Sequence, residues 1–186
     1  MAHPSAGLFS DETLHFNGKS TLISLQNGGG GKSVLVQMLT APFVHPKYRN
    51  TKDRLFESYF TTNKPSFILV EWALDQGAGY VLTGLMVRKS QDMEEDRKEN
   101  LDIIGIVSEY QSPCIQDIHH LPVVEKGKKE MILKNFNSCR QLFETYKKDR
   151  DMKFFYYDLT NYAQSRQYFN KLMEYQINYK EWETII

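Results

Sequence analysis

Apolar residues along this chain cluster in short runs that are separated by polar, turn-forming segments. Residues 67–74 and 80–88 are rich in Val, Ile, Leu, Phe and Trp, and 75–79 between them have the composition of a turn. This pattern predicts a β-hairpin. Residues 101–109 are expected to form a third strand of the same sheet, and 154–159 form a compact aromatic run that predicts another strand.

Three segments instead carry helical signals. Residues 34–39 are a short apolar stretch that ends before Pro42, and 136–146 show apolar residues at helical spacing. Asn161 has the side chain of a helix N-cap. The apolar positions of the helix that it would begin are Tyr162, Tyr168, Phe169, Leu172 and Met173.

A glycine run near the N-terminus is the strongest chemical signal in the sequence. Residues 13–25 predict one or two short strands with a turn at Asn17-Gly18. The glycine run 28–31 follows, and Lys32-Ser33 come directly after it. A phosphate-binding loop has the pattern Gly-x-x-x-x-Gly-Lys-Ser/Thr between a strand and a helix. The last three positions fit this pattern, whereas Gln26 occupies the position of the leading glycine.

Such a run is suited to binding a triphosphate. Backbone N–H groups of residues 28–32 can converge on phosphate oxygens because no side chains obstruct them, and the start of the next helix adds a partial positive charge. We expect Lys32 to lie between the β- and γ-phosphates and the Ser33 hydroxyl to bind Mg²⁺. A flexible glycine linker is the alternative, which the order of strand, glycines, Lys-Ser and helix disfavours. The expected nucleotide-binding residues are Asn27, Gly28, Gly29, Gly30, Gly31, Lys32, Ser33 and Val34.

A second Gly-Lys-Ser-Thr sequence, at residues 18–21, imitates the end of the same motif. No glycine run precedes it, and residues 22–25 after it predict a strand rather than a helix. We therefore do not expect it to bind phosphate.

A nucleotide hydrolase also needs an acidic residue at a strand end to help bind Mg²⁺. Two carboxylates follow strand-like runs, namely Glu71 and Asp158. Each has a plainer interpretation. Glu71 would lie inside a continuing strand, and Asp158 would end a strand or begin the turn into the last helix.

The composition adds limits to this picture. The 186 residues include 23 Lys+Arg and 23 Asp+Glu, so the formal net charge of zero argues against wholesale electrostatic binding of nucleic acid. We expect one domain or a large part of one, with residues 1–13 a candidate flexible segment. No secretory signal or membrane-spanning run is visible, which predicts a cytoplasmic protein. Cys114 and Cys139 are expected to be buried free thiols.

The strand-rich entry into Asn-Gly-Gly-Gly-Gly-Lys-Ser, followed by the hairpin at 67–88, resembles the N-terminal half of an SMC-type ATPase head. It is similar to the heads of MukB-like and Wadjet-type condensin ATPases. The resemblance implies an α/β fold, the N-terminal lobe of a P-loop NTPase of the ABC/SMC type with an antiparallel β-hairpin subdomain. In such proteins the signature motif and the acidic Mg²⁺ strand lie beyond a long coiled coil, which would explain why this chain lacks them.

Further residues follow from the resemblance. Gly31, Lys32 and Ser33 match the family's phosphate and Mg²⁺ positions, while the extra glycine here shifts Asn27 out of the usual spacing. The family's γ-phosphate-sensing glutamine has Gln111 and Gln176 as candidates. The region after the first helix, which often reaches nucleotide or DNA, contains Lys47, Arg49, Lys52 and Arg54.

Three hypotheses remain open at this point. In the first, the chain binds ATP and Mg²⁺ and needs a C-terminal lobe or a second head for hydrolysis, in DNA organisation, repair or defence. In the second, it is a self-contained small P-loop NTPase or kinase in which Asp158 or Glu71 binds Mg²⁺. In the third, it is an interaction module whose loop no longer binds nucleotide. The first two differ in sheet order, because a self-contained enzyme needs the acidic strand parallel and adjacent to the phosphate-loop strand.

Overall fold

The computed structural model describes residues 2–3, 7–8, 12–16, 18–24, 31–52, 54–91, 100–113, 121–129, 131–148 and 153–177. Strands come in runs in the first two thirds of this chain and alternate with α-helices only near its end. In order, they are β1 (Ala2–His3), β2 (Gly7–Leu8), α1 (Lys32–Thr40), β3 (Ser66–Ala73), β4 (Tyr80–Lys89), β5 (Leu101–Tyr110), β6 (Val124–Lys126), β7 (Met131–Leu133), α3 (Phe136–Lys148), β8 (Lys153–Asp158) and α4 (Tyr162–Glu174). Short 3₁₀ helices lie at Pro46–Tyr48, Phe56–Tyr59 and Asp75–Gly77.

The central sheet is antiparallel throughout, with the strand order β3-β4-β5-β8. Strands β3 and β4 form a hairpin whose first pair is Ala73 opposite Tyr80. Strand β5 continues the meander, and β8 joins its far side although α3 intervenes in the sequence. The remaining strands form two small antiparallel pairs, β1 with β2 and β6 with β7.

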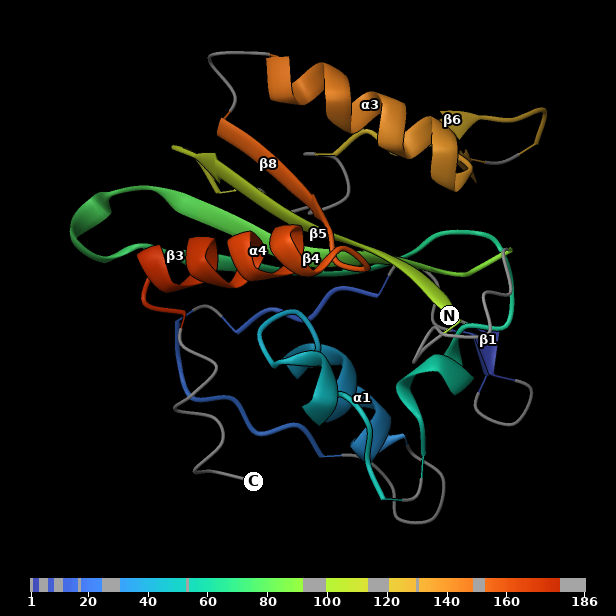
Figure 1. Cartoon of the computed structure of the whole chain (residues 1–186). Coiled ribbons are helices and arrows are strands. Elements are labelled where there is room, and N and C mark those ends of the chain that lie inside the picture. The colour runs from blue at the N-terminus through green and yellow to red at the C-terminus, as the bar shows by residue number, and fades with distance from the viewer. Residues whose placement is uncertain are drawn as a thin grey trace.

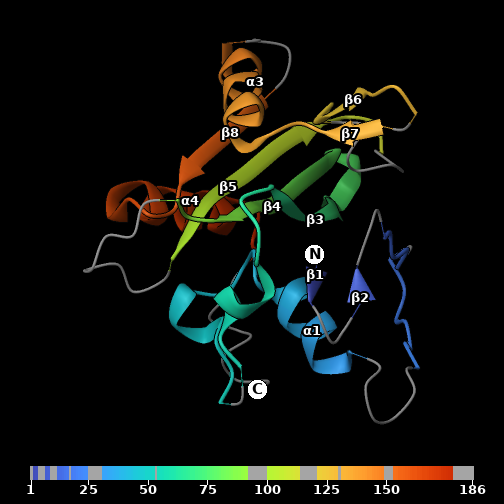
Figure 2. The ribbon, with the colours of Figure 1, turned by 90° about the vertical axis from the view of Figure 1, so that its right-hand side faces the viewer.

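Helices cover both faces of the sheet. Figure 1 shows α3 on one side and α1 on the other, with α4 lying against the sheet on the α1 side. Figure 2 shows that the β6–β7 pair lies on the side of α3. Two apolar clusters separate the layers. Val34, Leu85 and Tyr168 belong to the cluster beneath α1 and α4, whereas Ile106 and Phe143 belong to the cluster beneath α3.

Most of the predicted elements are confirmed. The predicted hairpin at 67–88, the third strand and the aromatic strand correspond to β3, β4, β5 and β8, and the three predicted helices correspond to α1, α3 and α4. The fold is therefore mixed α and β with an antiparallel hairpin, as expected. A parallel sheet of the P-loop type is not seen among the described residues.

The predicted strands at 13–25 are wrong for the part that is described. Residues 12–16 and 18–24 form no strand, although Lys19 N–H donates to the Phe16 carbonyl at 3.0 Å and confirms the turn near Gly18. Leu22 is 95% exposed. A β-strand requires a hydrogen-bonded neighbour, and no described segment pairs with this one.

The last helix begins where the sequence predicts, but two of its apolar positions face water. The Asn161 side chain accepts a hydrogen bond from Gln164 N–H at 3.1 Å, which confirms the N-cap. Tyr168, Phe169 and Leu172 are buried, whereas Tyr162 and Met173 are exposed. Tyr162 is the first residue of the helix, and Met173 is turned about 100° around the helix from the buried Leu172.

Candidate functional site

The candidate phosphate site is the start of α1. Gly31 is the N-cap of this helix and adopts φ 68° and ψ 19°, in the left-handed region that favours glycine. The first intrahelical bond runs from Leu35 N–H to the Gly31 carbonyl at 2.8 Å. The helix therefore supplies no acceptor for the N–H groups of Ser33 and Val34, which leaves them available to an anion.

Side chains at this terminus divide between solvent and core. Lys32 and Ser33 are exposed, while Val34 is buried against the sheet together with Met38. Only the backbone of Val34 can therefore contribute to a phosphate site. The other predicted loop residues, Asn27, Gly28, Gly29 and Gly30, lie outside the described residues.

The body of α1 is fixed by a buried polar cluster. Gln37 donates from Nε2 to the Arg49 carbonyl at 2.5 Å and accepts from the Tyr59 hydroxyl at 2.9 Å. Arg49 Nε in turn donates to the Ala41 carbonyl at 3.0 Å. These bonds join α1 to the segment that follows it, so the helix start is carried on a rigid support.

The same cluster corrects the expectation for Arg49. Its side chain is 1% exposed and lies 5.9 Å from the Phe56 ring centroid, so it supports α1 and does not reach nucleotide or DNA. The neighbouring basic residues are less buried than Arg49. Lys47 and Lys52 are exposed, and the half-buried Arg54 guanidinium lies 5.4 Å from the Tyr59 ring centroid.

The two candidate Mg²⁺ carboxylates lie on the opposite face of the sheet from α1. Side chains alternate along a strand, and Val70 and Trp72 pack in the α1 cluster, so Glu71 between them faces the other side. There it accepts a hydrogen bond from the Tyr110 hydroxyl at 2.5 Å. Asp158 shares the α3 face with Tyr156, and its carboxylate accepts from the Thr160 N–H and hydroxyl at 3.0 and 2.6 Å.

The remaining candidates are placed as follows. Gln111 follows β5 and lies beside Gly79, at the end of the β3–β4 hairpin, whereas Gln176 follows α4. The imitating Gly-Lys-Ser-Thr sequence begins in a turn, and no helix follows it in residues 20–24. Cys139 is a buried free thiol, as expected, and Cys114 lies outside the described residues.

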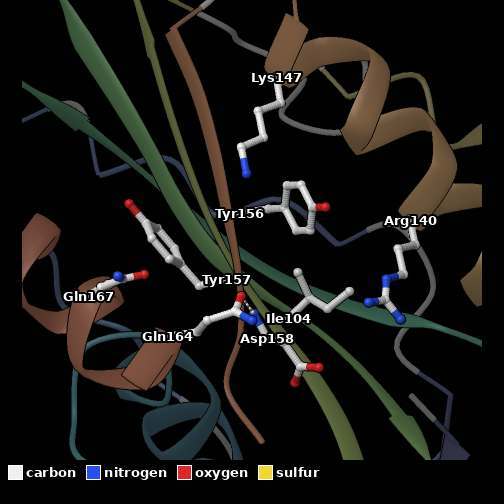
Figure 3. Close-up of a pocket in the computed structure, with 8 residues that line it drawn as sticks. All are labelled: Ile104, Arg140, Lys147, Tyr156, Tyr157, Asp158, Gln164 and Gln167. Carbon is white, nitrogen blue, oxygen red and sulfur yellow. Dashed lines mark hydrogen bonds between the residues drawn. The ribbon is translucent and has the colours of Figure 1, made fainter. Parts of the chain in front are cut away.

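The structure also contains a polar cavity that the sequence did not suggest. It has a volume of about 300 Å³ and is lined by residues of α3, β8 and α4 (Figure 3). Arg140 and Lys147 reach it from α3, and Gln164 and Gln167 reach it from α4. A spacing of seven residues places Arg140 and Lys147 on one side of α3, which is a signal that the sequence does contain.

Comparison with known proteins identifies no relative of this chain. The sequence matches no protein-family model, no curated protein and no solved structure. Within the part of the chain that the structure describes, no helix has the length and apolar character required to cross a membrane.

Proposed function

We propose that this chain is the ATP-binding half of an SMC-like ATPase head. The observation that carries the proposal is the left-handed Gly31 directly before a helix that begins at Lys32. This is the conformation that a phosphate loop needs, because it turns consecutive N–H groups and a lysine toward one anion. Lys32 and Ser33 are exposed at this terminus, and an ammonium group and a hydroxyl suit a triphosphate with its metal.

In this proposal Lys32 neutralises the β- and γ-phosphates and the Ser33 hydroxyl is a Mg²⁺ ligand. The proposed site also includes residues 27–30, which precede Gly31 in the sequence, and the backbone N–H of Val34. The donor set fits the metal, since Mg²⁺ prefers oxygen ligands and takes the rest from phosphate and water. The bound Mg²⁺ would neutralise charge that develops on the phosphates.

The sheet favours a half-head over a self-contained enzyme. Both Glu71 and Asp158 face away from α1, and β3 is antiparallel to β4, so neither carboxylate supports a Mg²⁺ ion bound at Ser33. A C-terminal lobe or a second head would supply the missing acidic residue and the signature motif. DNA organisation, repair or defence is the class of role that follows from the resemblance.

Exposed apolar side chains on α1 and in the segment before it are consistent with such a partner. Leu14, Phe16, Leu22 and Ile23 are exposed in a segment that pairs with no described strand, and Val36 is exposed on α1. Exposed apolar groups next to unpaired backbone are typical of surfaces that another chain or segment covers.

Titration with a fluorescent ATP analogue in the presence of Mg²⁺ tests the proposal, with circular dichroism to verify folding. We expect Lys32→Ala to weaken binding by at least about tenfold, because a charge-assisted contact to phosphate is lost. Lys19→Ala is the matched control, since Lys19 stands in the imitating Gly-Lys-Ser sequence, and it should bind like wild type. Ser33→Ala should reduce the dependence on Mg²⁺.

The alternatives give different results in the same experiment. No measurable binding by the folded chain would favour an interaction module without nucleotide. Steady ATP turnover by the purified chain alone, abolished by Lys32→Ala, would refute the half-head and favour a self-contained hydrolase. Equal loss of binding in Lys19→Ala would show that the signal is non-specific.

A further inference from the structure

Strand β8 forms one edge of the central sheet, and its outward backbone groups lack a strand partner among the described residues. Leu159 N–H donates to the Ile103 carbonyl at 2.9 Å, and Tyr157 lies opposite Gly105 in the same register. Backbone groups alternate in direction along a strand, so those of Phe154 and Tyr156 point away from β5. A row of such groups can pair with an added strand.

The cavity of Figure 3 crosses this edge. Tyr156 and Tyr157 both line it, and their side chains lie on opposite faces of the sheet, so the space must extend around the open side of β8. Helix α3 borders it on one face, and helix α4 borders it on the other. The result is a groove beside the strand that has a wall on each side.

One end of the groove is closed by a side chain that takes the place of a neighbouring strand. Gln164 Oε1 accepts a hydrogen bond from the Asp158 N–H at 2.9 Å. No described residue accepts from the N–H of Phe154 or Tyr156. The available stretch of edge is therefore short and ends at Asp158.

Cations outnumber carboxylates among the side chains that line the groove. Arg140 and Lys147 line it from α3, and the Lys147 ammonium lies 5.1 Å from the Tyr156 ring centroid. Asp158 is the carboxylate among the lining residues, and it accepts from the Thr160 N–H and hydroxyl. Glu144, which does not line the groove, accepts from the Tyr156 hydroxyl. Across the described residues, no carboxylate is paired with Arg140.

We propose that the β8 edge binds an extended acidic segment of a partner protein, which adds to the sheet as a fifth strand. Arg140 and Lys147 are roughly 10 Å apart along α3, at 1.5 Å per residue. Acidic residues at alternate positions of a strand repeat every roughly 6.7 Å on one face, so two of them can reach the two cations. The partner's backbone provides the hydrogen bonds, and its carboxylates provide selectivity. This surface is separate from α1, so the proposal does not depend on nucleotide binding.

Fluorescence anisotropy with a labelled eight-residue peptide of alternating Glu and Val tests strand addition. Two N-methylated forms, one methylated at every Glu and one at every Val, distinguish this mode, because only alternate amides of an added strand face β8. We expect one form to bind like the parent and the other to lose at least about tenfold in affinity. Equal binding by both forms, or no saturable binding of the parent, would overturn the proposal.

Charge-reversal variants test the role of the cations. Arg140→Glu with Lys147→Glu should weaken binding by at least about tenfold. Lys148→Glu is the matched control, because Lys148 is exposed on the same helix but does not line the groove, and it should change the affinity less than about threefold. An equal loss in the control, or equal binding of a Lys-Val peptide, would overturn the proposal. Light scattering gives a further test. A dimer that Arg140→Glu dissociates would assign the edge to a second copy of the chain and would also overturn the proposal.

Discussion

Replacement of Tyr168 by Phe is the sharpest test of how the α1 site is supported. Tyr168 lies on α4 and is fully buried. Its hydroxyl donates to the Pro42 carbonyl at 2.9 Å and lies 3.3 Å from the Gly84 carbonyl. Pro42 comes two residues after the end of α1, and Gly84 is in the middle of β4, so one hydroxyl joins three parts of the fold that are distant in sequence.

The expected cost follows from the bond and its burial. Tyr168→Phe keeps the ring, which packs edge-on against Phe169 at 5.3 Å, and removes only the donor. The Pro42 carbonyl is then buried without that partner, which costs about 1–3 kcal/mol. The ring also lies close over Gly105, where an added Cβ would be only 2.6 Å from it, so the ring keeps this packing in Tyr168→Phe. Burial raises the pKa of the Tyr168 phenol above its ordinary value, so the hydroxyl stays a donor at neutral and mildly alkaline pH.

Urea and thermal unfolding followed by circular dichroism measure this cost. The urea midpoint should fall without a change in slope, and the Tm should fall by roughly 2–4 °C for each kcal/mol lost in a chain of this size. Tyr162→Phe is the matched control, because Tyr162 is 84% exposed at the start of the same helix. If Tyr168→Phe unfolds like wild type, the hydroxyl contributes nothing and the argument about the support of α1 is wrong.

Two further predictions concern titratable groups. Burial raises the pKa of the Glu109 carboxyl, but the Tyr175 hydroxyl and the Lys153 and Lys171 ammonium groups outweigh it and leave the pKa below its ordinary value of 4.5. The contribution of the Glu109 carboxylate to stability is therefore complete above about pH 4.5 and is lost on acidification. Glu109→Gln should destabilise the chain at pH 7. The difference from wild type in urea unfolding should shrink below about pH 4.5. A difference that is constant from pH 7 to pH 3 would contradict this. Burial raises the pKa of the Cys139 thiol to about 11, although the Lys134 ammonium opposes this rise. The raised pKa lowers the thiolate fraction roughly a hundredfold. Iodoacetamide at pH 8, with peptide-level mass spectrometry, should leave Cys139 unmodified in the folded chain and modify it in urea; rapid modification without urea would show that the thiol is accessible.

Elements with a strong local pattern could be predicted from the sequence. Strands β3 to β5 and β8 carry continuous apolar runs, and the Asn161 cap is a local signal for α4. The segment around Leu22 has similar local composition but forms no strand, because strand formation depends on a neighbour that the local sequence does not specify.

The site could be predicted only where its chemistry is local. Gly31 was identified through a motif, and its left-handed conformation agrees with the motif's physical requirement. Burial of Arg49 could not be anticipated, since it depends on Ala41 and Phe56 closing around the side chain. The faces on which Glu71 and Asp158 lie could not be assigned either, because they follow from strand order and register.

Helix α4 gives the two proposed surfaces a physical connection. Its Tyr168 and Phe169 contact the segment after α1, where Phe169 stacks on His45 with ring centroids 6.1 Å apart. On the same helix, Gln164 and Gln167 line the groove at β8. Because α4 contacts both places, it is the element to substitute when coupling between them is measured. Any effect of a strand bound at β8 on nucleotide affinity at α1 must then be matched by an equal effect of nucleotide on the affinity of that strand.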